Sequence, residues 1–128
     1  MSNMLDSRYV AGLFDGEGCV MIKRNGKHRP QITMVVGSTY HPIVLELQKQ
    51  YGGSIYLNQR HRNNKQVYAW DITGKAAIAF LNNIAEFVII KKKQVNLVFN
   101  YWLELDEQKR EQMIIALNKM NRRGVTVK

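Results

Sequence analysis

Residues 9–18 read Y-V-A-G-L-F-D-G-E-G, and this stretch decides how the chain folds. Its apolar and small residues follow the spacing of a short amphipathic helix, with Gly12 and Gly16 on one face because they lie four positions apart. Glycine inside a helix costs about 1 kcal/mol relative to alanine, so two of them require a reason. We infer that this face lets a second backbone approach closely. Glu17 then follows at the end of the helix, between two glycines.

The positive charge of the chain, +9 in total, is concentrated in its middle. Residues 19–70 hold eight lysines and arginines and one acid, Glu46, whereas the rest holds eleven basic and nine acidic residues. Such segregation indicates a polyanionic partner, with nucleic acid favoured over an anionic membrane. A membrane is disfavoured because the chain lacks a basic amphipathic helix with bulky apolar anchors.

The length and composition predict one domain over residues 1–128, with a core at about 7–105 and a C-terminal helix at about 106–121. The single cysteine, Cys19, excludes an internal disulfide and a cysteine-based zinc site. Without an apolar run long enough for a bilayer or an export signal, the chain is expected to be intracellular. The sequence does not distinguish a prokaryotic cytoplasm from a mitochondrion or chloroplast.

Hydrophobic periodicity predicts a helix, two strands, a helix, two strands and then helices to the end of the chain. The first half is expected to hold a helix at 7–15, strands at 20–23 and 31–36, and a helix from Thr39 to 51. Strands at 55–60 and 67–73 follow, and then a helix opening at 74–75, a helix that carries residues 95–105, and a helix after Asp106. Asn25-Gly26 is a strong hairpin signal. Gly124 is expected to end the last helix. The fold class is therefore α/β in the mixed, α+β sense, with antiparallel hairpins.

Helices on one face of such a sheet leave the other face free for a partner. Strand alternation places a set of long polar side chains there, to which the loop after residue 60 adds two basic residues. The set consists of Lys23, Asn25, Lys27, Gln31, Thr33, Tyr56, Asn58, Arg60, Arg62 and Lys65. A twisted β-ribbon fits the DNA major groove, where such side chains read bases. Each residue alone fits a solvent-facing strand equally well, but the set, with almost no acids, favours DNA. Tyr68 and Trp70 share the parity of Ile72, and the sequence leaves open which face they take.

The two acids among the glycines, Asp15 and Glu17, suit a hard divalent cation with oxygen ligands, Mg²⁺ above all. One carboxylate makes a poor magnesium site. Two carboxylates, one from each of two chains, make a better one beside phosphate oxygens. A single copy of the stretch therefore fits a pair of chains.

The stretch resembles the LAGLIDADG motif of homing endonucleases. Five of the nine core letters are identical, and the other four are mild changes. The identical residues are Ala11, Gly12, Leu13, Asp15 and Gly18, and the changed ones are Val10, Phe14, Gly16 and Glu17. The resemblance covers most of the chain to about Tyr101, and outside the motif it is strongest at residues 91–97, K-K-K-Q-V-N-L.

The resemblance implies an αββαββα saddle, with additional C-terminal helices here, whose concave sheet lies in the major groove. A single motif implies a homodimer, with the motif helix as its seam. The seam residues would be Ala11, Gly12, Leu13, Asp15 and Gly16. The implied activity is Mg²⁺-dependent hydrolysis of both strands of double-stranded DNA at a long pseudo-palindromic site.

The same resemblance assigns roles to single residues. Glu17 and the Gly16 carbonyl would bind the metal, and Mn²⁺ would be able to replace Mg²⁺. Asp15 is expected to have a structural role at the end of the helix instead. Lys91 would act beside the scissile phosphate, with Lys93 as the alternate, and Ser38 or Thr39 would orient water. Two other functions stay open on this fold: an intron RNA maturase, and a catalytically inactive DNA-binding regulator, against which the retained Glu17 argues.

Overall fold

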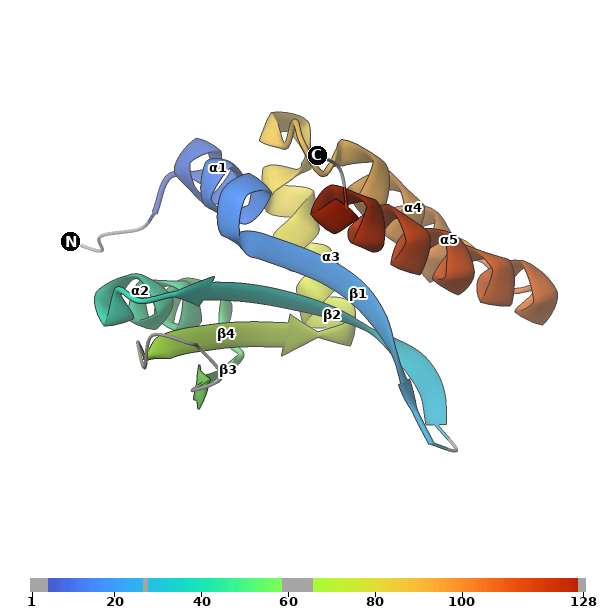
Figure 1. Cartoon of the computed structure of the whole chain (residues 1–128), viewed down its shortest axis with the longest axis horizontal. Coiled ribbons are helices and arrows are strands. Elements are labelled where there is room, and N and C mark those ends of the chain that lie inside the picture. The colour runs from blue at the N-terminus through green and yellow to red at the C-terminus, as the bar shows by residue number, and fades with distance from the viewer. Residues whose placement is uncertain (1–4, 27, 59–65, 127–128) are drawn as a thin grey trace.

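The computed structural model describes residues 5–26, 28–58 and 66–126 (Figure 1). Its elements are α1 (Ser7–Glu17), β1 (Gly18–Asn25), β2 (His28–Ser38), α2 (His41–Tyr51), β3 (Ser54–Asn58), β4 (Val67–Thr73), α3 (Gly74–Ile84), the 3-10 turn η1 (Ala85–Phe87), α4 (Lys92–Leu103) and α5 (Glu107–Thr126). The predicted order and the α+β class are confirmed. Within these residues, no helix combines the length and the apolar character needed to cross a membrane.

The four strands form one antiparallel sheet in the order β1-β2-β4-β3. The β1–β2 hairpin turns at Gly26, whose φ of 57° is the left-handed conformation that glycine adopts readily. Pairing of β2 with β4 joins the two hairpins, with Met34 opposite Ile72 and Val36 opposite Trp70. In Figure 1 the long, curved β1–β2 hairpin reaches well beyond β4 and β3.

The core lies between the helices and one face of the sheet. Phe80 of α3 is at its centre, edge-to-face with Trp70 at 5.3 Å and with Phe14 of α1 at 6.4 Å between ring centroids. Trp70 is fully buried, and its indole Nε1 donates to the Gly52 carbonyl at 2.7 Å. Tyr68 stacks on His41 of α2 at 4.3 Å. Both aromatic residues of β4 therefore lie on the helix-covered face, which settles their placement.

Helix α5 packs along β1, the edge strand of the sheet. The Asn121 side chain donates to the Val20 carbonyl at 3.0 Å, so α5 covers a strand edge that would otherwise expose unpaired backbone groups. Asp106 begins this helix by accepting a hydrogen bond from the Lys109 N–H at 2.9 Å. The helix runs to Thr126, so the expected ends near residue 121 and at Gly124 were wrong. A single glycine costs a helix only about 1 kcal/mol, which does not by itself end it.

Two other helix boundaries differ from expectation. Helix α1 continues to Glu17 because the Gly18 N–H caps it by donating to the Phe14 carbonyl. Helix α2 begins at His41, and Thr39 does not cap it. Instead, the Ser38 hydroxyl accepts a hydrogen bond from the Tyr40 N–H at 3.0 Å and shapes the turn before the helix.

Candidate active site

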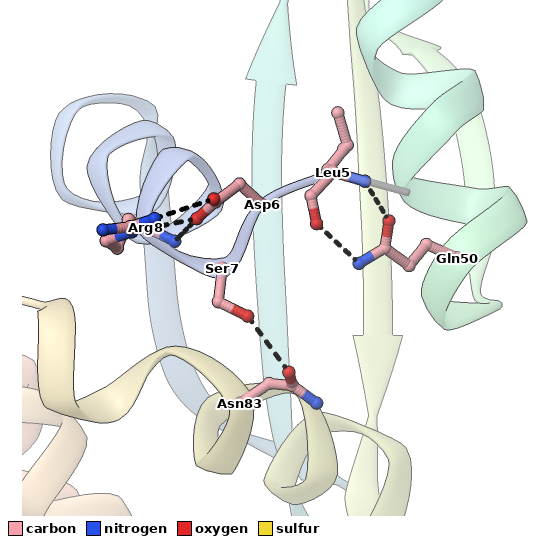
Figure 2. A network of polar contacts seen from close by, with 6 residues as sticks. All are labelled: Leu5, Asp6, Ser7, Arg8, Gln50 and Asn83. Atoms are coloured by element: carbon pink, nitrogen blue, oxygen red, sulfur yellow. Dashed lines mark hydrogen bonds and ion pairs between the residues drawn. The ribbon is translucent and has the colours of Figure 1, made fainter. Parts of the chain in front are cut away.

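Helix α1 is fixed at its start by contacts to α2 and α3 (Figure 2). The Gln50 amide makes two hydrogen bonds with the Leu5 backbone, accepting from its N–H at 2.6 Å and donating to its carbonyl at 3.2 Å. The Ser7 hydroxyl donates to the Asn83 side-chain oxygen at 3.3 Å. Asp6 caps the first turn by accepting from a backbone N–H at 2.7 Å. The helix therefore has a defined direction toward the residues at its other end.

Asp15 fixes the other end of α1 to the segment before α4. Its carboxylate accepts hydrogen bonds from the N–H groups of Ile89 at 2.8 Å and Lys91 at 3.0 Å, and the residue is only 9% exposed. The Lys91 ammonium in turn donates to the Asp15 carbonyl at 2.6 Å. These contacts give Asp15 a structural role. They correct its expected place in a dimer seam, because its side chain is directed into its own chain.

Glu17 is the last residue of α1, and both it and Gly16 are exposed. The Gly16 carbonyl is among the last four of the helix, which have no partner further along it. The negative end of the helix dipole also favours a cation at this position. A carboxylate and a carbonyl oxygen are the donors that hard divalent cations take, so this pair fits Mg²⁺ or Ca²⁺.

Lys91 is brought to the same end of α1 from 74 residues further along the chain than Glu17. Its ammonium lies against the end of the helix, 5.9 Å from the Phe14 ring centroid. Its charge also acts on Cys19 of β1: burial raises the pKa of the Cys19 thiol, and Lys91 opposes that rise. Cys19 is thus a neutral thiol at pH 7.

One face of α1 is open. Tyr9, Gly12, Leu13 and Gly16 follow the spacing of a single helix face. Among the described residues, a Cβ added to Gly12 or Gly16 would meet no atom within 4 Å, and Tyr9 is 53% exposed. Packing within this part of the chain therefore gives no reason for either glycine. Ala11 differs from its neighbours, because it is fully buried in the chain's own core, so its expected role in a seam is corrected.

The face of the sheet opposite the helices carries part of the predicted DNA-facing set. Lys23, Gln31 and Tyr56 are exposed there. Thr33 is on the same face but is only 3% exposed, so its predicted contact with DNA was wrong. It lies on a central strand between Met21 and Thr73, and its hydroxyl donates to the Gln31 carbonyl at 3.4 Å.

The rest of that set is less fully placed. The backbones of Asn25 and Asn58 end β1 and β3. Lys27, Arg60, Arg62 and Lys65 lie outside the described residues. Ser38 and Thr39 follow Val36, which pairs with Gly18, so the register places them beside the junction of α1 and β1.

Two basic residues of the hairpin have acidic partners on α5. The Arg24 guanidinium makes two contacts with the Glu111 carboxylate, one of them at 3.0 Å, and Arg29 lies 3.6 Å from Glu107. The concentration of charge in residues 19–70 is therefore partly balanced by a helix that follows it in sequence.

Solved structures resemble the chain over most of its length, whereas no protein-family model matches it. I-CvuI, a homing endonuclease solved with its DNA target and calcium, is 21% identical with a TM-score of 0.64, covering 87% of this chain and 74% of that one. The archaeal intron-encoded I-Vdi141I, solved with DNA, is 21% identical with a TM-score of 0.64, covering 88% and 82%. The homing endonuclease I-TnaI is 17% identical with a TM-score of 0.66, covering 90% and 89%. The chain has the LAGLIDADG homing endonuclease fold.

A curated protein is also similar in sequence to this chain. The intron-encoded DNA endonuclease ai2b of Dictyostelium discoideum is 26% identical over 102 residues. The match covers 77% of this chain and 39% of that protein, so the chain spans about two fifths of its relative. The fold predicted from residues 9–18 is confirmed by the structural similarity.

Sequence reasoning missed one acidic residue on the sheet of this LAGLIDADG fold. Asp71 of β4 lies opposite Val35 of β2 and Ser54 of β3, on the face away from the helices. Strand alternation from Trp70 and Ile72, both buried, would have placed it there. Asp71 lies one position beyond the strongly basic stretch of residues 19–70.

Proposed function

We propose that this chain is a homodimeric, sequence-specific endonuclease that cuts both strands of DNA with the help of Mg²⁺. One observation supports this most directly: an exposed carboxylate, Glu17, ends a helix whose open face carries two glycines, and neither glycine has a role in packing against the residues that the structure describes. The fold and the intron-encoded DNA endonuclease among its relatives point to the same activity.

The dimer follows from the open face of α1. Burying Gly12, Leu13 and Gly16 against the same face of a second copy satisfies the need of small residues for a close backbone neighbour. A two-fold axis along this seam places the ends of the two helices side by side, and with them two copies of Glu17. Exposed Ile89 and Ile90, beside the end of α1, extend the apolar surface available to the partner.

The two Glu17 carboxylates and Gly16 carbonyls would hold the metal. A bound divalent cation polarises the phosphate and lowers the pKa of a coordinated water. Lys91 uses one of its three donors on the Asp15 carbonyl, which leaves two for a phosphate oxygen. The cradle of hydrogen bonds around Asp15 holds this ammonium at the end of α1, where it can stabilise the charge that builds up on the scissile phosphate.

The sheet provides the binding surface. Its free face exposes Lys23, Gln31 and Tyr56, a donor-rich combination that suits base edges and phosphates. The extended β1–β2 hairpin adds length to this surface, as Figure 1 shows. Two sheets in one dimer fit a long site with two related halves.

Glu17→Gln tests the proposal. The change removes one negative charge and keeps the shape of the side chain, so we expect at least a hundredfold loss of Mg²⁺-dependent cutting with DNA affinity nearly unchanged. Glu46→Gln on α2 removes the same charge away from the site and serves as the control. Cutting is measured on DNA selected from a random library. Intron RNA is added as a competitor to test the alternative function of an RNA maturase. Undiminished cutting by Glu17→Gln would contradict the assignment of the metal ligand.

A further inference from the structure

The sheet's free face contains an acid that the binding of DNA by basic and polar residues does not explain. Asp71 lies on β4, and its neighbours on the same face of this strand are Ala69 and Thr73. The register places Asp71 directly opposite Val35 on one side and Ser54 on the other, so it has a neighbouring strand on each side, at the end of the β3–β4 pairing.

Asp71 lines a shallow depression in this surface, together with Lys23, Gln31 and Thr73. It also borders a second depression at the edge of the sheet, which Ser54 and Ala76 of α3 line. Among the described residues, none of the ion pairs involves Asp71, although Lys23 lines the same depression. An ionised carboxylate only accepts hydrogen bonds. Against a DNA polyanion it therefore opposes binding, unless the DNA presents a donor to it.

We propose that Asp71 reads a cytosine in the major groove, an assignment that rests on the proposed DNA endonuclease function. The cytosine edge presents the N4 amino group, a donor that a carboxylate accepts. Guanine presents O6 and thymine presents O4, both acceptors that repel a carboxylate, whereas adenine presents its N6 donor beside the N7 acceptor. Asp71 thus selects by penalty as well as by attraction, because guanine or thymine leaves a desolvated charge without a partner.

Asp71 differs from the other exposed polar residues of this face, and each copy of the dimer brings one Asp71 to its own half of the DNA site. Lys23, Gln31 and Tyr56 are exposed on the same face, and each of their side chains carries a hydrogen-bond donor. They can therefore donate to acceptor atoms of bases and phosphates. Asp71 carries no donor. In a two-fold dimer the two copies of Asp71 read the same base in each half-site, so the cytosine requirement appears at two symmetric positions.

The test is selection of bound DNA from a randomised library with Ca²⁺ in place of Mg²⁺, using the full chain. The wild-type protein is expected to require cytosine at one symmetric pair of positions, where replacement by thymine weakens binding by about five- to 150-fold. Asp71→Ala should lose this preference and retain the others. Asp71→Asn, which keeps the side chain's shape, should shift the preference toward adenine, the base that asparagine reads.

The outcomes separate the possible roles of Asp71. Glu46→Gln, which removes an acid from α2, should leave the whole profile unchanged. A profile that is unchanged in both Asp71 variants overturns the assignment. Loss of preference across all positions also overturns it, because Asp71 would then shape the sheet without reading a base. A wild-type protein that selects no sequence at all would contradict the proposed function itself, and this assignment with it.

Discussion

Gly18 shows at the scale of a single residue why the last letter of the motif is a glycine. A Cβ there would lie 2.5 Å from Phe14 Cδ1 and 2.9 Å from the Phe14 carbonyl oxygen. Its φ of −102° is ordinary, so the requirement is space and not conformation. The chain passes from α1 into β1 directly over the Phe14 ring, and this close turn brings Glu17 to the edge of the sheet.

Gly18→Ala should therefore destabilise the chain by roughly 1–3 kcal/mol, because a buried clash forces Phe14 out of its preferred position. Gly37→Ala is a matched control on β2, where an added Cβ would make an ordinary contact at 3.4 Å with Val67. Urea unfolding of the two variants and the wild type measures the difference. Equal stability of the two variants would show that the Phe14 contact does not constrain residue 18.

Helix α1 illustrates what one element contributes. Contacts with Gln50 and Asn83 hold its first turn, and Asp15 holds its last. One face is buried in the core and another is open, with Gly12 and Gly16 on it. A helix fixed at both ends can present an open face in a constant orientation, which a symmetric seam requires.

Gly12→Val should block dimer formation while leaving the single chain folded. Valine is a better helix former than glycine, and a Cβ at residue 12 meets no atom of the described residues within 4 Å, so we expect the fold to keep its stability. The branched side chain prevents the approach of a second helix. Sedimentation equilibrium should give the mass of a monomer, and DNA cutting should fall with it. Asn118→Val on the exposed face of α5 is the control. If Gly12→Val still sediments with the mass of a dimer, the proposed seam is contradicted.

At the scale of the whole molecule, α5 connects the C-terminal residues to the DNA-facing hairpin. Asn121 bonds to the edge of β1, and Glu107 and Glu111 pair with the hairpin arginines Arg29 and Arg24. The hairpin reaches beyond the rest of the sheet in Figure 1, so these contacts provide lateral support that neither β3 nor β4 gives it.

Glu111→Gln should loosen the hairpin with little change in global stability, since exposed ion pairs contribute little. Hydrogen exchange at Ile22 and Ile32, which face each other in β1 and β2, should become faster. The hydrogen bond from Arg24 lowers the pKa of Glu111 from its ordinary value of 4.5. The pair is therefore intact at neutral pH and is lost as the pH falls through that lowered pKa. Below it, protection in the wild type should approach that of the variant. Exchange that is the same in both proteins at pH 7 would show that the pair does not support the hairpin.

The motif helix, the Asn25-Gly26 hairpin and the order of the elements could be predicted from the amino-acid sequence, because they depend on local spacing and turn chemistry. Alternation also placed Lys23, Gln31 and Tyr56 on the free face. Sequence alternation could not predict that Thr33 on this face is covered or that Trp70 belongs to the core, because both depend on how distant residues pack. Only the tertiary structure decided that Arg24 has an acidic partner 87 positions away and that Asp15 is held by the segment before α4. Periodicity tells which side of its own element a residue takes, but what lies against that side depends on packing between distant parts of the chain.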